Sequence, residues 1–371
     1  MSVVYKKLEE VCEILDSQRV PITAKDRKSG VYPYYGANGL QDHVSDYIFD
    51  DELVLLAEDG GNFGSKDRPI AYRVSGKCWV NNHAHVLKAK SDIHIDYLCY
   101  ALMFYNTDGL VNGATRQKLT QAAMRQMVIP YRCMKEQEQI VDEISRVFHL
   151  IAVRNEELDL LEQLVKSRFI GLFGDAPDEE KVTMAAICKI ITDGTHQPPK
   201  FVSEGIPFLF VSNIVTNEIS YDAQKFISEE TYAELIKRTP IAIGDILLST
   251  VGSYGHPAVV KTEKPFCFQR HIAYLKPNAD IVDSEYLRGA ILSADVQRQI
   301  DEGVKGIAQK TLNLSEIRKI KLPLPPIEQQ KQFAAFVEQT DKSKFFACQT
   351  LSFSLKLANN LQSWREKQYD Y

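Results

Sequence analysis

Two short stretches carry residue types that could serve as metal ligands or catalysts. His83 and His85 alternate on a predicted strand, so both side chains would lie on one face. A metal pair needs further ligands, and the neighbouring sequence offers no third one, so we expect these histidines to pack or to make polar contacts. PDEEK at 177–181 has the letters of nuclease sites, but its carboxylates are bunched in a predicted interdomain turn. We interpret it as a solvated linker.

The sequence contains no recognised catalytic motif. It has no GxxxxGK[ST] phosphate loop, no GxGxxG after a strand, and no GxSxG or HExxH. QPPK at 197–200 differs from the [DN]PP[FYW] of amino-methyltransferases, and no glycine-rich loop for S-adenosylmethionine accompanies it. We therefore expect a chain that is not an enzyme and holds no cofactor and no metal, which favours a role in recognition.

Positive charge gathers in two places that precede predicted helices. Residues 112–135 contain five basic residues and no acidic one, and residues 303–321 contain five basic residues and one acidic residue. Residues 136–162, by contrast, contain eight acidic and two basic residues, while the net charge of the whole chain is −5. Basic loops beside an acidic rod suit phosphate contacts made by the loops.

The two basic loops belong to an internal repeat. DELVLLAEDGGNFG at 51–64 parallels GDILLSTVGSYG at 244–255. A repeat this long predicts a duplicated domain, because solenoid repeats have periods of about 20–50 residues. With an offset of 193 residues the following identities occur without a gap: Gly113, Leu119, Arg125, Pro130, Gln137 and Gln139 fall on Gly306, Leu312, Arg318, Pro323, Gln330 and Gln332.

Each half is predicted to contain a globular part and a long helix. Short strands such as Leu53–Ala57, Ile246–Thr250 and Val259–Lys261 mix with helices such as Ser228–Lys237 and Tyr286–Ile300, which predicts an α+β fold. We expect four segments with these bounds: a first globular domain at 1–130, a first long helix at 131–174, a second globular domain at 175–322 and a second long helix at 323–371.

The two long helices have apolar residues at heptad spacing, which predicts that each packs along another helix. The simplest arrangement is an antiparallel coiled coil that separates two similar domains with pseudo-two-fold symmetry; the alternative places each helix on its own domain. The seam of the first helix is Ile144, Val147, Ile151, Leu158, Leu161 and Val165, and the weaker second seam is Phe333, Val337, Thr340, Ala347, Leu351, Ala358 and Leu361.

The composition is that of an ordinary globular protein. Of the 371 residues 44% are hydrophobic and 25% charged. No signal peptide and no run of about 18 apolar residues is found, so we expect no membrane association. The seven cysteines are scattered and form no CxxC pair, which predicts reduced thiols in the cytoplasm.

Four sequence segments resemble those of the specificity (S) subunits of type I restriction–modification systems, and the resemblance covers essentially the whole chain. They are YPYYGANGLQDHVSDYIFD (32–50), LVKSRFIGLFGDAP (164–177), GIAQKTLNLSEIRKIK (306–321) and LPLPPIEQQKQFAAFV (322–337). One departure is IPYRCMKEQEQI (129–140), which replaces the PLPP-type phrase of the family in the first half.

The resemblance implies two target-recognition domains, each reading one half of a bipartite site in double-stranded DNA. It implies that two conserved long helices form an antiparallel spacer and recruit two methyltransferase (M) subunits, which bind S-adenosylmethionine. Restriction (R) subunits would join this core. The target sequence and the length of the gap do not follow from the resemblance.

We expect DNA contacts from the polar loops, where Arg and Lys favour guanine and Asn and Gln favour adenine in the major groove. The candidates are Gly60, Gly61, Asn62, Asn82, Arg116 and Lys118 in the first domain and Ser253, Tyr254, Gln269, Arg270, Gln309 and Lys310 in the second. The partner-binding candidates on the helices are Ile144, Ile151, Leu158, Val165, Phe333, Val337 and Leu351.

Two other functions remain as alternatives to this interpretation. A coiled-coil adaptor with two ligand-binding domains would show no salt-dependent binding to DNA. A self-sufficient methyltransferase or nuclease would need a site for S-adenosylmethionine or a metal, which the motif search does not find.

Overall fold

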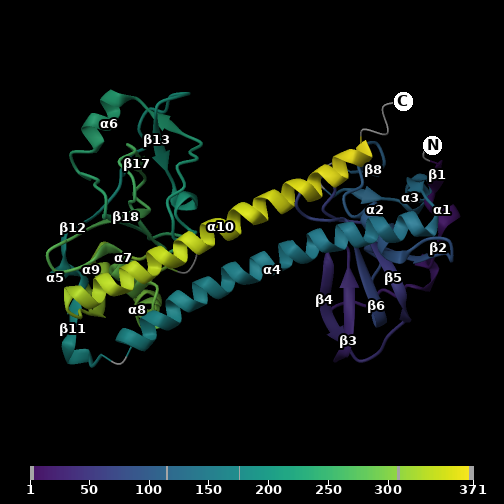
Figure 1. Cartoon of the computed structure of the whole chain (residues 1–371), viewed down its shortest axis with the longest axis horizontal. Coiled ribbons are helices and arrows are strands. Elements are labelled where there is room, and N and C mark those ends of the chain that lie inside the picture. Colours follow the sequence, from purple (N-terminus) through teal and green to yellow (C-terminus); the bar gives the residue numbers. More distant parts are fainter. Residues whose placement is uncertain (1–3, 114–115, 175, 307–309, 367–371) are drawn as a thin grey trace. The chain divides into compact units, whose positions relative to one another are not determined.

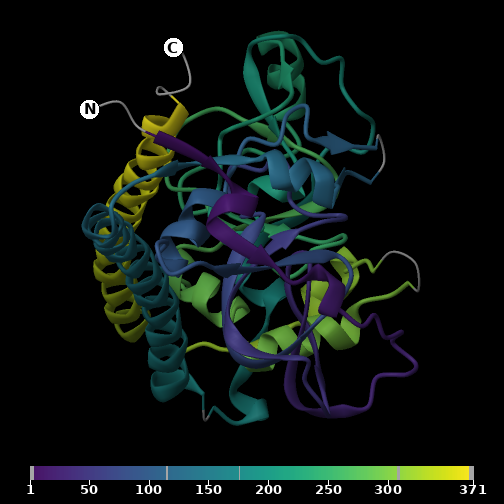
Figure 2. The same ribbon diagram turned by 90° about the vertical axis from the view of Figure 1, so that its right-hand side faces the viewer.

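The computed structural model describes residues 4–113, 116–174, 176–306 and 310–366, with the backbone alone for 353 and 355–366 (Figure 1). Two compact units divide the chain: unit 1 is Met1–Val153 with Leu351–Tyr371, and unit 2 is Arg154–Thr350. Each unit therefore contains a globular part, a portion of α4 (Met134–Phe173) and a portion of α10 (Ile327–Glu366). Both views show these two helices as continuous (Figure 1, Figure 2).

Unit 1 is built on a six-stranded sheet with the order β2-β7-β5-β6-β3-β4. Along the central strand, Leu53 and Leu55 belong to one buried cluster, and Val54 and Leu56 to another. Successive side chains of a strand point to opposite faces, so the continuous apolar run reflects a strand buried on both sides. The strands are β2 (Cys12–Ile14), β3 (Ser29–Gly36), β4 (Gly39–Val44), β5 (Phe49–Ala57), β6 (Ala71–Val80) and β7 (Ala84–Ala89).

Short elements complete unit 1 and lead into α4. The chain enters along β1, which pairs antiparallel with β10 directly before α4. The Leu8 amide donates to the Met127 carbonyl at 2.9 Å and extends this pairing. The remaining elements are β1 (Val4–Lys7), α1 (Leu8–Val11), α2 (Ile95–Leu102), β8 (Val111–Asn112), β9 (Lys118–Leu119), α3 (Gln121–Gln126) and β10 (Val128–Tyr131).

Unit 2 repeats this plan with a four-stranded sheet in the order β12-β18-β15-β16 and a second sheet in the order β14-β13-β17. Its entry strand β11 pairs antiparallel with β19 before α10, and the Met184 amide donates to the Ile320 carbonyl at 2.8 Å. The strands are β11 (Lys181–Thr183), β12 (Cys188–Asp193), β13 (Ile206–Leu209), β14 (Phe226–Ile227), β15 (Ile246–Ser249), β16 (Pro257–Val259), β17 (Cys267–Phe268), β18 (Ile272–Pro277) and β19 (Lys321–Pro323).

The helices of unit 2 correct one expectation from the sequence. They are α5 (Met184–Ile187), α6 (Glu229–Leu235), α7 (Ser284–Ile291), α8 (Ala294–Gly303) and α9 (Leu314–Lys319). The expected single helix Tyr286–Ile300 is wrong, because the Ser293 hydroxyl accepts from the Val296 amide and so caps the start of α8. The mixture of helices and strands confirms the α+β class.

The two long helices each contain 40 residues, and their first residues differ in number by the offset of the sequence repeat. In unit 2 the end of α4 packs on the beginning of α10: the rings of Phe169 and Phe173 lie 5.4 and 6.0 Å from that of Phe333. The two helices are therefore antiparallel there. Gly289 of α7 permits this packing, because a Cβ at that position would lie 2.7 Å from the Phe333 ring.

A buried glutamine attaches each long helix to its globular part. Gln137, in the first turn of α4, is 0% exposed. Its Oε1 accepts from the His94 amide at 2.8 Å, and its Nε2 donates to the carbonyls of Asp92 at 3.0 Å and Arg132 at 2.9 Å. The side chain thus joins the loop before α2 to the start of α4.

Gln330 makes the same three bonds at the start of α10 and is also 0% exposed. It accepts from the Asp283 amide at 2.9 Å and donates to the carbonyls of Ile281 at 3.1 Å and Pro325 at 2.8 Å. The repeated glutamines of the sequence therefore have one structural role, which confirms the internal repeat. Among the described residues, no helix is both long and apolar enough to cross a membrane.

Candidate nucleic-acid interface

In each unit the loop after the central strand is hydrogen-bonded to the segment before α3 or α9. In unit 1 the Leu119 amide donates to the Glu58 carbonyl at 2.8 Å and the Gly60 amide to the Gln117 carbonyl at 3.1 Å. Residues 58–60 and 116–119 thus form a backbone frame at one end of the sheet. Gly60 has a φ of +69°, a conformation that favours glycine.

Unit 2 contains the same frame with other side chains. The Leu312 amide donates to the Thr250 carbonyl at 2.8 Å and the Gly252 amide to the Lys310 carbonyl at 3.3 Å. Gly252 again has a positive φ, +74°. The basic loops that precede the long helices in sequence therefore lie beside the glycine-rich loops after β5 and β15.

A turn before β7 or β18 joins the frame in each unit. In unit 1 the Glu58 amide donates to the His83 carbonyl at 2.8 Å, and in unit 2 the Thr250 amide donates to the His271 carbonyl at 2.9 Å. The hairpin between β3 and β4 also meets the unit 1 frame, since the Asn38 side chain donates to the Gly60 carbonyl at 3.0 Å. Four segments of unit 1 that are distant in sequence thus present polar groups in one place.

The cations of the unit 1 frame are paired with carboxylates of the opposing loop. Arg116 Nε lies 2.6 Å from Asp59 Oδ1, and Lys118 Nζ lies 3.3 Å from Glu58 Oε1. The side chains of Arg116 and Lys118 are nevertheless 59% and 50% exposed. Both cations are thus oriented by the protein and accessible to a ligand.

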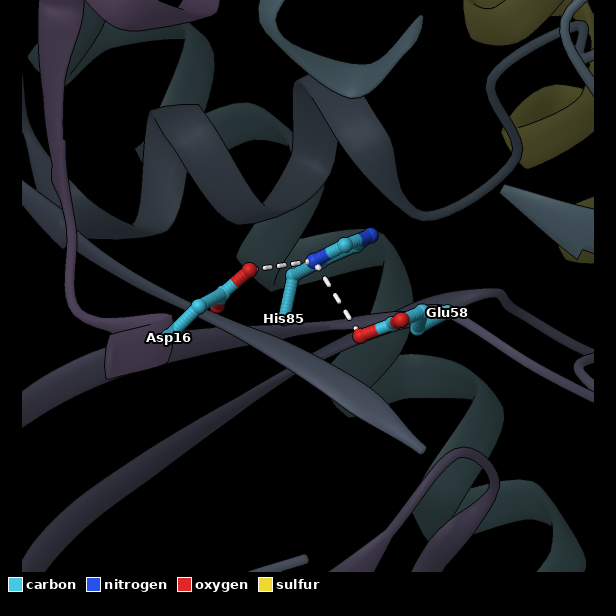
Figure 3. Close-up of side chains that lie close together, drawn as sticks. All are labelled: Asp16, Glu58 and His85. Carbon is cyan, nitrogen blue, oxygen red and sulfur yellow. Dashed lines mark hydrogen bonds and ion pairs between the residues drawn. The ribbon is translucent and has the colours of Figure 1, made fainter. Parts of the chain in front are cut away.

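A buried polar network lies beneath this frame, and Figure 3 shows its centre, with one ring nitrogen of His85 facing both Asp16 and Glu58. His85 Nδ1 lies 2.6 Å from Asp16 Oδ2, and Nε2 lies 2.9 Å from the Leu119 carbonyl. The Arg19 guanidinium donates to Glu58 Oε2 at 2.7 Å. The polar contact expected for His85 is confirmed.

The same trio has atom types found in metal sites, and its ligand atoms lie within 4.8 Å of one another. This trio could not be predicted from the sequence, because Asp16 follows β2 and Glu58 follows β5, whereas His85 lies in β7. Both ring nitrogens of His85 already have partners, and Arg19 places a positive charge beside Glu58. A bound cation would displace these contacts, so the residues fit a structural network and not a metal centre.

Asp16 is ionised in this network. Burial alone would raise its pKa, but the hydrogen bond and charge of His85, the Val86 amide and the Gln121 side chain together hold the pKa below its ordinary value. The carboxylate therefore accepts bonds from β7 and from α3, and it fixes the end of the 116–119 segment to the sheet. His83, expected on a strand, lies in the turn before β7 instead, because the strand begins at Ala84.

The unit 2 frame carries different polar groups. The Tyr254 hydroxyl donates to Asp301 at 2.9 Å, and Lys310 lies 6.0 Å from the centre of the Tyr254 ring. Burial and the charge of Arg270 lower the pKa of His271, so its neutral ring can accept from Arg270 Nε at 3.4 Å. No carboxylate stands at the positions equivalent to Glu58 and Asp59, which are Thr250 and Val251 within the described chain.

The structure places the other candidate contacts as follows. Asn82 and Ser253 are exposed at their turns, and Gln269 lies in the turn before β18, where its amide donates to the Leu209 carbonyl at 3.1 Å. Asn62 uses its side chain within its own loop, donating to the Pro69 carbonyl at 3.3 Å. Gly61 faces Ala57, where a Cβ would have no room. Gln309 lies outside the described residues.

Sequence reasoning missed Asn38 and His83 at this site. The Asn-Gly pair at Asn38–Gly39 is a hairpin signal, and it could have placed a polar tip near the glycine-rich loop. His83 is 3.3 Å from Asp59 and 3.4 Å from Arg116. The pairing of β5 with β7 brings Asp59 to His83, and the backbone bonds of 116–119 to 58–60 bring Arg116 there.

The candidate residues of the helices differ in exposure. Phe333 and Val337 are 0% and 1% exposed inside the core of unit 2, so their side chains are not accessible to another subunit. The remaining five, Ile144, Ile151, Leu158, Val165 and Leu351, are half-buried. A second apolar stripe on α4 is exposed, and so is an aromatic pair on α10: Leu150, Val153, Leu160 and Leu164, with Phe345 and Phe346.

Comparison with known proteins gives one consistent family. Residues 2–163 and again 180–347 match the family described as Type I restriction modification DNA specificity domain. A putative type I restriction enzyme specificity subunit of Haemophilus influenzae is 27% identical over 352 residues, covering 90% of this chain and 86% of the relative. The type I restriction enzyme MjaVIII specificity subunit of Methanocaldococcus jannaschii is 20% identical over 369 residues, covering 90% and 85%.

Two solved structures share the fold. The S subunit of a type I restriction–modification system from M. genitalium aligns with a TM-score of 0.59 at 13% identity, covering 97% of this chain and 95% of that chain. A chain from a study of complex assembly and conformational transition in the type I R-M system aligns with a TM-score of 0.53 at 16% identity, covering 97% and 96%.

Proposed function

Because the chain belongs to the family of type I restriction modification DNA specificity domains, we propose that each of its globular parts reads one half of a bipartite DNA site. It is a specificity subunit, and its two matches to the same family domain correspond to two readers. The alternative of a DNA-independent adaptor has no support among its relatives.

The observation that carries this proposal is the frame that recurs in both units. The backbone bonds are the same, at 2.8 and 3.1 Å in unit 1 and 2.8 and 3.3 Å in unit 2, while the side chains on the frames differ. Fixed backbones with exchanged polar side chains suit two readers of different base sequences, because sequence is read by side chains at base edges. Lysine and arginine beside them suit phosphate contacts.

We propose that α4 and α10 set the gap between the two half-sites. A helix of 40 residues is about 60 Å long at 1.5 Å per residue. Two-part readers need a fixed separation to engage two half-sites, and a pair of packed helices resists bending better than a loop does. The antiparallel packing of Phe169 on Phe333 supports such a spacer.

The catalytic work of the complex is proposed to lie in other subunits. The chain would recruit two methyltransferase subunits, which supply S-adenosylmethionine, and restriction subunits would join them on DNA in the cytoplasm. The exposed side chains of Leu160 and Leu164, 55% and 49% exposed on α4, with Phe345 and Phe346, 59% and 66% exposed on α10, suit such a contact. Exposed apolar patches of this kind mark protein interfaces.

The experiment that tests this function is an exchange of one reader. Residues 1–130 are replaced with the equivalent segment of another family member, and the chain is expressed with its methyltransferase subunits. Sequencing of methylated bases should show a new first half-site and an unchanged second one. The reciprocal exchange of 175–322 is the control and should change only the second half-site.

Two outcomes would contradict the proposal. If both half-sites changed together in either exchange, the two globular parts would not be independent readers. If the assembled complex bound DNA with no dependence on salt or sequence, the chain would not be the specificity component.

A further inference from the structure

We propose that Arg116 reads a guanine of the first half-site and that Asp59 and His83 are the positioning residues that orient it. This inference rests on the proposed function and adds to it the chemical identity of one base. Arg116 suits this role because of the contacts that it already makes, the N–H donors that it leaves available, and its difference from Lys118.

Arg116 is held from one side only. Its Nε lies 2.6 Å from Asp59 Oδ1 in an ion pair, and its Nη2 lies 3.4 Å from His83 Nδ1. A guanidinium carries five N–H donors, so donors remain available on the two terminal nitrogens. Its side chain is 59% exposed. The free edge is the one that can make two parallel bonds to guanine O6 and N7, the commonest specific contact in the major groove.

Asp59 can orient the guanidinium because its own position is fixed. It directly follows the loop residue Glu58, its amide donates to the His83 carbonyl at 3.3 Å, and its side chain is only 21% exposed. Its second oxygen lies 3.3 Å from His83 Nδ1. One carboxylate therefore contacts both Arg116 and His83, and a recognition side chain works best when such contacts hold its geometry.

Gly60 leaves the space that this arrangement needs. A Cβ at this position would lie 3.3 Å from Arg116 Nε, closer than side chains normally approach. The glycine also has a φ of +69°, so the loop can turn directly beneath the guanidinium. The path of the backbone and the place of Arg116 thus depend on each other.

Lys118 has the geometry of a phosphate contact and serves as the comparison. Its ammonium lies 3.3 Å from Glu58 Oε1, and the other oxygen of Glu58 is bound by Arg19 at 2.7 Å. A single ammonium is a point charge and cannot make the planar two-bond contact of a guanidinium. We therefore expect Lys118 to add affinity for any DNA sequence.

The test uses the full chain assembled with its methyltransferase subunits and a DNA library in which each base pair of both half-sites is varied. Arg116→Ala, Arg116→Lys and Asp59→Asn are compared by sequencing methylated products, and Lys118→Ala is the control. Arg116→Ala should relax selection at one G·C pair of the first half-site by about 5- to 150-fold. Arg116→Lys should do the same, because charge alone does not restore the two bonds.

Asp59→Asn should relax the same pair by a smaller factor, and every other position should keep its selectivity. A merely structural role for Asp59 would instead lower methylation evenly. Lys118→Ala should weaken binding to all sequences and reduce the slope of log affinity against log salt by about 0.9. The second half-site is an internal reference in each variant.

Two results would overturn the inference. One is an even loss of binding in Arg116→Ala with a lower salt slope, which would make Arg116 a phosphate contact. The other is relaxation at an A·T pair. Either result leaves the reader exchange of residues 1–130 unaffected, so failure of this inference is distinguishable from failure of the proposed function.

Discussion

Replacing Gln330 with alanine is expected to destabilise the attachment of α10 to the globular part of unit 2 by about 3 kcal/mol. The side chain is fully buried and makes three hydrogen bonds, at 2.9, 3.1 and 2.8 Å. A hydrogen bond in a protein contributes roughly 1 kcal/mol net, and a buried group that loses its partner costs about 1–3 kcal/mol. Three bonds at roughly 1 kcal/mol each therefore give about 3 kcal/mol.

Native-state hydrogen exchange is the suitable assay, because a chain of two units need not unfold in one step. The Asp283 amide donates to Gln330 Oε1, so it reports on this contact directly. A loss of about 3 kcal/mol corresponds to a more than 100-fold rise in the open population. The exchange rate of this amide should rise by the same factor in Gln330→Ala.

The neighbouring Gln329 provides a matched control, because it lies in the same turn of α10 and is exposed. Gln329→Ala should leave the Asp283 amide unchanged. The equivalent pair in unit 1 is Gln137→Ala, read at the His94 amide, with the exposed Gln139→Ala as its control. An equal response of buried and exposed glutamines would refute this reasoning.

Four further outcomes are expected. The ionised form of Asp16, whose folded pKa lies below the ordinary 3.8, stabilises the fold above that pH, and the benefit is lost as pH falls through the lower folded value. Asp16→Asn should therefore unfold with a weaker acid dependence below pH ~4 in circular dichroism, and an unchanged dependence would contradict the network. Four residues added after Asn155 of α4 and beside Ala347 of α10 lengthen the pair by about 6 Å. Methylation mapping should show a gap longer by roughly one or two base pairs, and a fixed gap in an active complex would contradict the spacer. Leu160→Ser with Leu164→Ser should weaken assembly with methyltransferase subunits in size-exclusion chromatography, whereas unchanged assembly would place their contact elsewhere. The purified chain alone should transfer no methyl group and cleave no DNA, and turnover of S-adenosylmethionine would show a catalytic site.

The repeat in the sequence predicted the main architecture because it consists of short sequence segments that can be recognised without knowledge of the fold. The offset of 193 residues that aligned Gln137 with Gln330 also separates the starts and the ends of α4 and α10. Heptad spacing selected Phe333 and Val337, which are buried. It could not show that a second stripe, at Leu160 and Leu164, would stay exposed.

Contacts between segments that lie far apart in the sequence could not be predicted from it. His85 and Asp16 are 69 residues apart, and only the pairing of β2 with β7 brings them together. The count of basic residues in 112–135 missed the carboxylates that face Arg116 and Lys118, because these come from the loop after β5. The break before α8 did have a local signal at Ser293, but helical periodicity on both sides concealed it.

The buried glutamines have a consequence for how such proteins can change over generations. Gln137 and Gln330 bond only to backbone amides and carbonyls, and every amino acid offers a carbonyl. These hydrogen bonds therefore do not depend on which side chains the loop carries, whereas the packing of Phe333 does require the small Gly289. We therefore expect a genetic exchange that brings in a new globular part to retain this attachment. If each globular part reads its own half-site as proposed, a lineage would then acquire a new target in a single recombination event.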